Sequence, residues 1–154
     1  MKRLSFGLFA IFCLLACASC KTGNRSKNPL ATASFPKPDV TAANFQAGQT
    51  TFKSGDQVNF TWTVENVGNK ETGQFRYGLY SSSDNTVDVN DTLLFPETVQ
   101  NLDKNTNRTI NDKFIVNVQP GTYFWAIIAD DQNVLTEWTK GNNTSTPVVQ
   151  ITIN

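Results

Sequence analysis

The sequence predicts an all-β fold, namely an immunoglobulin-like β-sandwich of about seven strands with Greek-key connections. Three observations support this prediction. From residue 39 onward the apolar residues recur with a period of two, and no window sustains a 3.6-residue period. After residue 50 the polar filler is mainly Asn, Thr, Asp, Gln and Ser, a composition typical of strands and turns. A domain near 120 residues is also long enough to bury a core.

The first strands are expected between residues 40 and 66. Residues 40–45 are expected to form the first strand, and residues 50–52 are expected to continue it. The clearest strand follows, because four apolar residues alternate there with polar ones: Val58, Phe60, Trp62 and Val64. The turn residues at 66–69 end it.

The remaining strands are expected at 74–81, 92–99, 108–118, 122–129 and 147–154. Pro96 places the second of these at a sheet edge or at a bulge. Residues 122–129 are apolar on both faces, which favours a central strand. Without cysteines, the core is expected to depend on packing among Trp62, Phe60, Phe75, Phe114 and Phe124.

The N-terminus has the pattern of a secretory signal. A basic start at residues 1–3 precedes the uncharged, mostly apolar run 4–18, which is shorter than the ~20 residues of a membrane-spanning helix. Its end resembles a lipobox, with Cys20 as the favoured lipidated residue and Cys17 as the alternative; ordinary cleavage without lipid stays open. We therefore expect a signal peptide at 1–19, a flexible tether with the lipidated cysteine at 20–35, and the domain at 36–154.

Charge and residue types limit the functions of this domain. Residues 36–154 hold 8 Lys and Arg against 13 Asp and Glu, a net charge of −5, which argues against nucleic acid as a partner. The chain has no His, and its three cysteines lie at positions 13, 17 and 20. The domain therefore lacks an imidazole base, a thiolate nucleophile and a Cys/His zinc site, and we expect that it is not an enzyme.

Three blocks of sequence resemble the CARDB family, whose name refers to cell adhesion in bacteria. The blocks are Asn59–Gly68, then Gly78–Asp84 with Asp91–Leu94, and then Pro120–Tyr123 with Ala129, Asp130, Glu137, Asn142 and Asn143. The resemblance implies an immunoglobulin-like sandwich on a secreted or surface protein. One departure is Thr139-Lys140, which stands where the family usually has an Asn-Glu pair and weakens any metal role for that loop.

One candidate metal site lies in the loop 83–91. Its oxygen-bearing side chains, at Asp84, Asp88, Asn90 and Asp91, have a spacing that Ca²⁺ could use, although no bidentate Glu closes the loop. The alternative interpretation is that these residues cap turns through local backbone hydrogen bonds. Calcium is the one cofactor that the sequence suggests.

A candidate binding site surrounds the last long loop, with Trp138, Asp130, Glu137, Asn142 and Asn143. An exposed Trp beside polar groups can stack on a sugar or anchor a protein, although Trp138 could instead cover the sandwich edge. The sequence thus predicts a membrane-anchored, non-catalytic binding or adhesion-type module of the cell envelope, on the outer membrane or cell surface, with a protein or glycan ligand. The alternatives are a carboxylate-based glycan hydrolase and an accessory subunit of an envelope complex.

Overall fold

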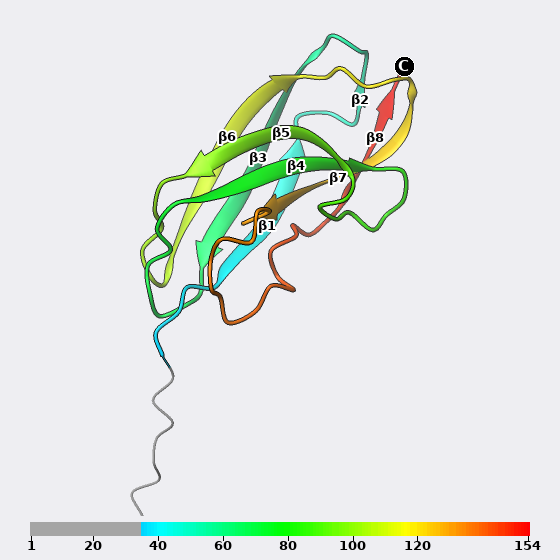
Figure 1. Ribbon diagram of the computed structural model, residues 1–154. Coiled ribbons are helices and arrows are strands. Elements are labelled where there is room, and N and C mark those ends of the chain that lie inside the picture. The colour runs from blue at the N-terminus through cyan, green and yellow to red at the C-terminus, as the bar shows by residue number, and fades with distance from the viewer. Residues whose placement is uncertain (1–34) are drawn as a thin grey trace, which may run out of the picture. The chain divides into compact units, whose positions relative to one another are not determined.

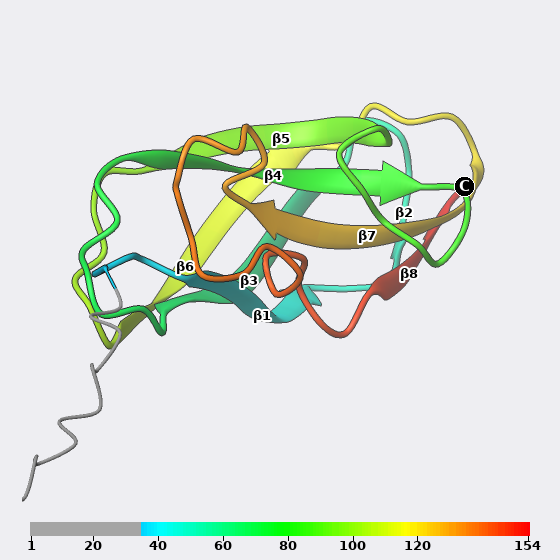
Figure 2. The same ribbon diagram turned by 60° about the horizontal axis from the view of Figure 1, so that its bottom comes forward.

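A computed structural model describes residues 35–154 of the protein. Eight strands form two facing sheets, so the predicted all-β sandwich is confirmed (Figures 1 and 2). The expected signal peptide, Cys20, Cys17 and all but the last residue of the tether lie outside the described residues. Between residues 35 and 154 there is no helix long and apolar enough to cross a membrane.

One sheet has three strands in the order β1-β3-β6. The strands are β1 (Val40–Ala47), β3 (Gln57–Asn66) and β6 (Thr106–Ile115), and both pairings are antiparallel. The regular alternation of β3 buries one face and leaves the other half-exposed, as its sequence predicted. A register shift between Ala43 and Gln46 interrupts the pairing of β1 with β3, and Asn44 there has a φ of 55°.

The second sheet has five strands in the order β2-β8-β7-β4-β5. They are β2 (Thr51–Phe52), β8 (Val149–Ile153), β7 (Gly121–Ala129), β4 (Phe75–Ser82) and β5 (Thr92–Val99). The central position of β7 is confirmed, since it pairs with both β4 and β8. The prediction for β5 is confirmed as well, because this strand lies at the sheet edge with a register irregularity opposite Leu79 and Tyr80.

Aromatic side chains from both sheets fill the space between them. Trp62 and Trp125 are the largest fully buried side chains, and Phe52 stacks on Trp125 with ring centroids 6.0 Å apart. The ring centroid of Phe60 lies 5.7 Å from that of Phe95, and the centroids of Phe95 and Phe114 lie 6.1 Å apart, so the edge strands β5 and β6 of the two sheets are in contact. The predicted core members Trp62, Phe60 and Phe75 are buried, and Phe114 packs against them while partly exposed.

Two predictions about the strands are wrong. Residues 51–52 do not continue β1 but pair in parallel with β8 in the other sheet, because the chain crosses from one sheet to the other at residues 48–50. Phe124 lies outside the main core and packs against a smaller cluster on the outer face of the five-stranded sheet, which contains Tyr80, Val87 and Ile128. The loop after β4 covers that face with Val87, so β7 is apolar on both sides.

The turn after β3 is held by one buried amide. The Asn66 side chain accepts hydrogen bonds from the amides of Asp39 and Gly68, both at 3.1 Å, and donates to the carbonyls of Lys70 and Leu102. A Cβ on Gly68 would lie 2.5 Å from the backbone of the segment before β1. The Asn-x-Gly sequence therefore fixes the start of β1 against the end of β3.

Candidate functional site

The segment between β7 and β8, residues 130–148, is named here the closing loop. It leaves the end of β7 and runs beside the start of β1, where it is drawn in orange to red (Figures 1 and 2). The Ala42 amide donates to the Asn142 carbonyl at 3.2 Å, and the Ala129 amide donates to the Asn143 carbonyl at 2.9 Å. Because β1 and β7 belong to different sheets, the closing loop ties the two sheets together at this end.

Asp130 begins the closing loop in the left-handed backbone region, with a φ of 46°. Its side chain is fully buried and accepts two backbone hydrogen bonds, from the Val134 amide at 2.9 Å and from the Leu135 amide at 3.1 Å. Asp tolerates this backbone conformation better than most residues because its short side chain bonds locally. Asp130 therefore shapes the first turn of the loop.

Glu137 joins the closing loop to β1. One carboxylate oxygen, Oε1, accepts a hydrogen bond from the Val40 amide at 2.8 Å. The other oxygen, Oε2, accepts one from the Asn143 side chain at 3.1 Å, and Asn143 also donates to the Ala129 carbonyl. The Glu137 side chain has no exposed surface, so burial of this charge requires these partners.

Lys140 folds back onto both carboxylates. Its Nζ lies 2.6 Å from Asp130 Oδ2 and 2.8 Å from the Leu135 carbonyl oxygen, and it forms a closer ion pair with Glu137 Oε2. Burial alone lowers the pKa of Lys140, but the hydrogen bonds and charges of Asp130 and Glu137 outweigh burial and raise that pKa. The ammonium therefore stays charged between two buried acids.

Two other predicted binding residues have different environments. The Asn142 side chain donates to Asp39 Oδ1 at 3.1 Å, so it also connects the loop to the start of β1. Trp138 is 48% exposed, and its ring lies 5.7 Å from the Lys37 ammonium in a cation–π contact. The structure thus gathers Asp130, Glu137 and Asn143 into one buried network and leaves Trp138 as the accessible aromatic group of the predicted binding set.

The three aspartates of the predicted calcium set in the loop 83–91 accept hydrogen bonds from nearby backbone amides. Asp84 accepts from the Thr86 amide at 2.8 Å, and Asp88 accepts from the Asn90 amide at 2.7 Å. Asp91 accepts from the Asp88 amide at 2.8 Å. No three acidic side chains come together to hold a metal ion within residues 35–154, so these side chains are not brought to a common point.

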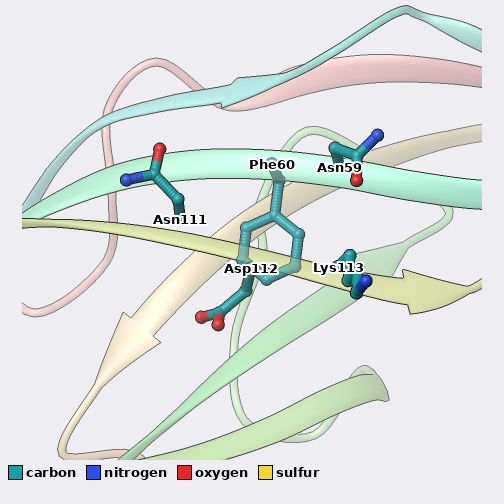
Figure 3. A pocket seen from close by; sticks show the side chains of 5 residues that line it. All are labelled: Asn59, Phe60, Asn111, Asp112 and Lys113. Carbon is teal, nitrogen blue, oxygen red and sulfur yellow. The ribbon is translucent and has the colours of Figure 1, made fainter.

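A third region, which the sequence did not predict, is a shallow depression across β3 and β6. It has a volume of about 450 Å³ and is lined by Asn59, Phe60, Asn111, Asp112 and Lys113 (Figure 3). Asp112 accepts a hydrogen bond from the Tyr77 hydroxyl of the facing sheet. Burial, and then that hydrogen bond, raise the pKa of Tyr77 above its usual value. Asp112 lies on the same face of β6 as Ile110 and Phe114, because the three residues alternate with others along the strand. This alternation was the signal in the sequence that Asp112 faces inward.

A second ion pair lies near the start of the closing loop. The Arg76 guanidinium donates to both carboxylate oxygens of Asp131, at 2.7 to 3.1 Å, and the Tyr80 hydroxyl donates to the same carboxylate at 2.8 Å. Burial is the main cause that raises the pKa of Tyr80 to about 12, and the Asp131 hydrogen bond adds to it. This group was also missed, because Arg76 and Asp131 are 55 residues apart.

Together, the fold and this site define an immunoglobulin-like module whose end loop is fixed by buried ion pairs. The chain matches the CARDB family over residues 37–147, which is most of its length, and it therefore belongs to that family. The resemblance of the three sequence blocks to CARDB is thus confirmed. No curated protein matches the chain.

Solved structures of low sequence identity have the same fold. A CARDB domain from Pyrococcus furiosus, determined in complex with di-metal ions, is 18% identical with a TM-score of 0.58, covering 78% of this chain and 96% of that one. A domain of a Methanosarcina acetivorans protein described as a cell-surface protein is 18% identical with a TM-score of 0.55, covering 77% and 93%. A β-glucosidase from Erythrobacter marinus is 15% identical with a TM-score of 0.51, covering 76% of this chain but 16% of that enzyme.

Proposed function

We propose that this CARDB domain is a non-catalytic binding module, held at the bacterial cell envelope by a lipid on Cys20. The proposal rests on the closing loop, whose two acidic side chains are buried and form hydrogen bonds and ion pairs within the domain. Asp130 and Glu137 accept hydrogen bonds from backbone amides, and both form an ion pair with the Lys140 ammonium. Such carboxylates stabilise a loop and are not free to exchange protons with a substrate.

The residue types support the same function. The chain has no His, and its cysteines at positions 13, 17 and 20 precede the sandwich. A rigid sandwich displays its variable groups on the end loops, and Trp138 is the aromatic side chain that such a loop offers here. We expect Trp138 to contact a protein or glycan on another cell component, because Trp supplies a large apolar face with one donor.

The location of the proposed anchor rests on the sequence. Residues 1–19 have the features of an export signal, and Cys20 follows two small residues. A lipidated cysteine inserts into a bilayer with about 0.8 kcal/mol per buried methylene, and the tether then holds the domain at the outer membrane or cell surface. The likeness to a domain described as belonging to a cell-surface protein is in keeping with that location.

Lipidation can be tested by mass spectrometry of the full chain extracted from bacterial membranes. We expect a mature N-terminus at Cys20 carrying acyl mass, lost in Cys20→Ala and kept in the matched variant Cys17→Ala. Acyl mass that disappears only in Cys17→Ala would move the anchor to Cys17. A mature chain without acyl mass in the unaltered protein would contradict membrane anchoring.

Binding can be tested with arrays of glycans and peptides. We expect binding that Trp138→Ala weakens at least tenfold, while Val89→Ala, at a comparably exposed residue in the loop 83–91, leaves it unchanged. Hydrolysis of any glycoside or peptide on the array would instead support the hydrolase alternative. Binding unaffected by Trp138→Ala would remove this residue from the contact surface.

A further inference from the structure

Strand β6 forms an open edge of the three-stranded sheet. It pairs with β3 alone, over 10 residues in an unbroken register, and its sequence contains neither Pro nor Gly. Figures 1 and 2 show β6 in yellow beside β3, at the outer side of that sheet. The backbone amides and carbonyls along such an edge are a template for a further strand.

The other three sheet edges are protected against pairing. β1 has a register shift and is covered by the closing loop, where the Ala42 amide donates to the Asn142 carbonyl at 3.2 Å. β2 has only 2 residues, and β5 combines Pro96 with a register irregularity. Proteins commonly prevent edge pairing by these means. In the described part of the chain, β6 is the long edge that has none of these features and depends on its charged side chains.

The hydrogen bonds of β3 show which backbone groups of β6 are free. The Asn59 carbonyl accepts from the Gly48 amide at 2.8 Å, on the β1 side of β3. The backbone groups of the next residue, Phe60, therefore point the other way, toward its partner Asp112 in β6. The Val116 amide, four residues after Asp112, donates to the segment before β3 in the same phase. Because this direction alternates along a strand, the even-numbered residues of β6 bond to β3 and the odd-numbered ones point away from it.

The outward backbone groups limit how a second copy of β6 can pair. Between residues 35 and 154 their amides and carbonyls have no hydrogen-bond partner in the backbone. An antiparallel ladder forms only where outward-pointing residues of one strand meet outward-pointing residues of the other. A second copy can therefore pair only in registers that match odd-numbered residues with odd-numbered residues. The outward residues are Asn107, Thr109, Asn111, Lys113 and Ile115.

Charge selects one of these registers. Arg108 and Asp112 lie on the same face of β6 with Ile110 midway between them. A two-fold axis at Ile110 places Arg108 of each copy opposite Asp112 of the other, so that two opposite-charge pairs form. An axis at Arg108 or at Asp112 would oppose like charges. An axis at residue 109 or 111 would leave both charges opposite neutral residues.

Both charged groups are available for this pairing. Arg108 is exposed, and no ion pair between residues 35 and 154 involves it. Oδ2 of Asp112 accepts from the Tyr77 hydroxyl, and no hydrogen bond within the described chain involves its Oδ1. Asp112 can therefore keep its contact with Tyr77 and still accept from a guanidinium at the edge of the sheet.

We propose that two copies of the domain associate through β6, antiparallel about a two-fold axis at Ile110, so that the two three-stranded sheets become one continuous sheet. Thr109 then pairs with Asn111 of the second copy, and Asn107 pairs with its Lys113. Each of these pairs exchanges two backbone hydrogen bonds. The association requires neither the lipid on Cys20 nor Trp138, so its test is independent of the function proposed above.

Analytical ultracentrifugation at about 1–500 µM protein measures the association. It uses the chain from residue 21 onward, because both clusters of buried apolar side chains lie within residues 40–153. Thr109→Pro removes an outward amide and leaves the bonds to β3 intact, and Thr109→Ala is its control because it keeps that amide. Arg108→Glu opposes like charges, and Lys37→Glu makes the same change of charge before β1, at the opposite edge of the sheet.

The unaltered domain should dimerise reversibly with a Kd of about 100 µM or below. Thr109→Pro and Arg108→Glu should each raise this Kd at least about tenfold, whereas both control variants should change it less than about threefold. Hydrogen exchange measured by NMR at high and low protein concentration reports the register. Association should slow exchange at the amides of residues 107, 109, 111 and 113 and leave that of Ile115 unchanged, because its opposite residue lies before β6.

A monomer at every concentration would overturn the proposal. So would a dimer that a folded Thr109→Pro variant leaves intact, equal effects of Arg108→Glu and Lys37→Glu, or slowed exchange at Ile115. If circular dichroism shows that Thr109→Pro does not fold, Arg108→Glu and the exchange pattern decide.

Discussion

Replacement of Asp130 by Ala tests how much the closing loop depends on its buried carboxylate. The variant loses two hydrogen bonds from backbone amides and the ion pair with Lys140. It also leaves Glu137 as the only acid bound to that ammonium, and it places Ala at a φ of 46°. Two hydrogen bonds to a buried charged group contribute together about 3–5 kcal/mol, and a left-handed Ala adds roughly 1 kcal/mol.

We therefore expect Asp130→Ala to reduce the free energy of unfolding by about 4–6 kcal/mol, a large part of the ~5–15 kcal/mol typical of a domain. Asp130→Asn keeps a carbonyl acceptor and tolerates the left-handed backbone, so its cost should be smaller, about 2 kcal/mol. Asp84→Ala is the matched control in the loop 83–91, where a single exposed hydrogen bond is lost, and it should cost below ~1 kcal/mol.

Urea denaturation followed by circular dichroism measures all three variants. With a slope of about 1–3 kcal/mol per molar urea, Asp130→Ala should lower the urea midpoint by more than about 1 M. Equal midpoints for Asp130→Ala and Asp84→Ala would show that the buried network contributes no more to stability than a hydrogen bond in an exposed turn, contrary to this prediction. A greater loss in Asp130→Asn than in Asp130→Ala would refute the part assigned to the backbone conformation.

Three further results are expected. Gly68→Ala should destabilise the domain by more than ~2 kcal/mol in urea, because its Cβ would meet backbone atoms at 2.5 Å, whereas Gly141→Ala, with its nearest atom at 3.8 Å, should be near neutral. Trp125→Phe should reduce the free energy of unfolding by about 2–4 kcal/mol, since the indole fills the core and donates to the Ser81 hydroxyl at 3.1 Å. Ser81→Ala removes only that hydrogen bond and should cost about 1 kcal/mol, so equal losses in the two variants would contradict this assignment. The pKa of Tyr80 is about 12 in the folded protein and 10 in the unfolded chain, so the stabilisation by its neutral hydroxyl is complete below pH 10 and is lost as the pH rises toward 12. Tyr80→Phe should therefore lose less stability between pH 10 and 12 than the unaltered domain does, and identical profiles of unfolding free energy against pH would contradict this.

Local patterns predicted most of the strands. The alternation in β3 and in β8 is a property of adjacent residues, and it alone determines which face of each strand is buried. Pro96 limited β5 to an edge for an equally local reason, since proline lacks an amide hydrogen. These features could be predicted because no distant part of the chain changes them.

Long-range pairing explains the errors. Thr51 pairs with Thr152, about a hundred residues away, so no local pattern could show that β2 belongs to the five-stranded sheet. Phe124 and Trp125 occupy opposite faces of an apolar strand, and the Val87 loop determines which face receives the smaller cluster. Apolarity on both faces predicted a central strand but could not tell its inner face from its outer face.

The candidate site shows the same limit. Asp130, Glu137 and Asn143 were predicted binding residues of one loop, and the structure brings them together. Lys140 was visible in the sequence only as a departure from the family pattern, because a lysine in a polar loop usually stays in water. The closing loop turns back so that Lys140 meets Asp130 ten residues earlier, and only the folded backbone shows this return.

We infer that the acids of the closing loop stabilise the sandwich and do not act on a substrate. Hydrogen exchange measured by NMR tests it most directly, at the three amides that bond to these carboxylates: Val40, Val134 and Leu135. These amides should exchange as slowly as those in the middle of β7, because the buried carboxylates keep these hydrogen bonds closed until the closing loop itself unfolds. Exchange as fast as at Thr86 and Asn90, whose amides bond to exposed aspartates, would contradict the account.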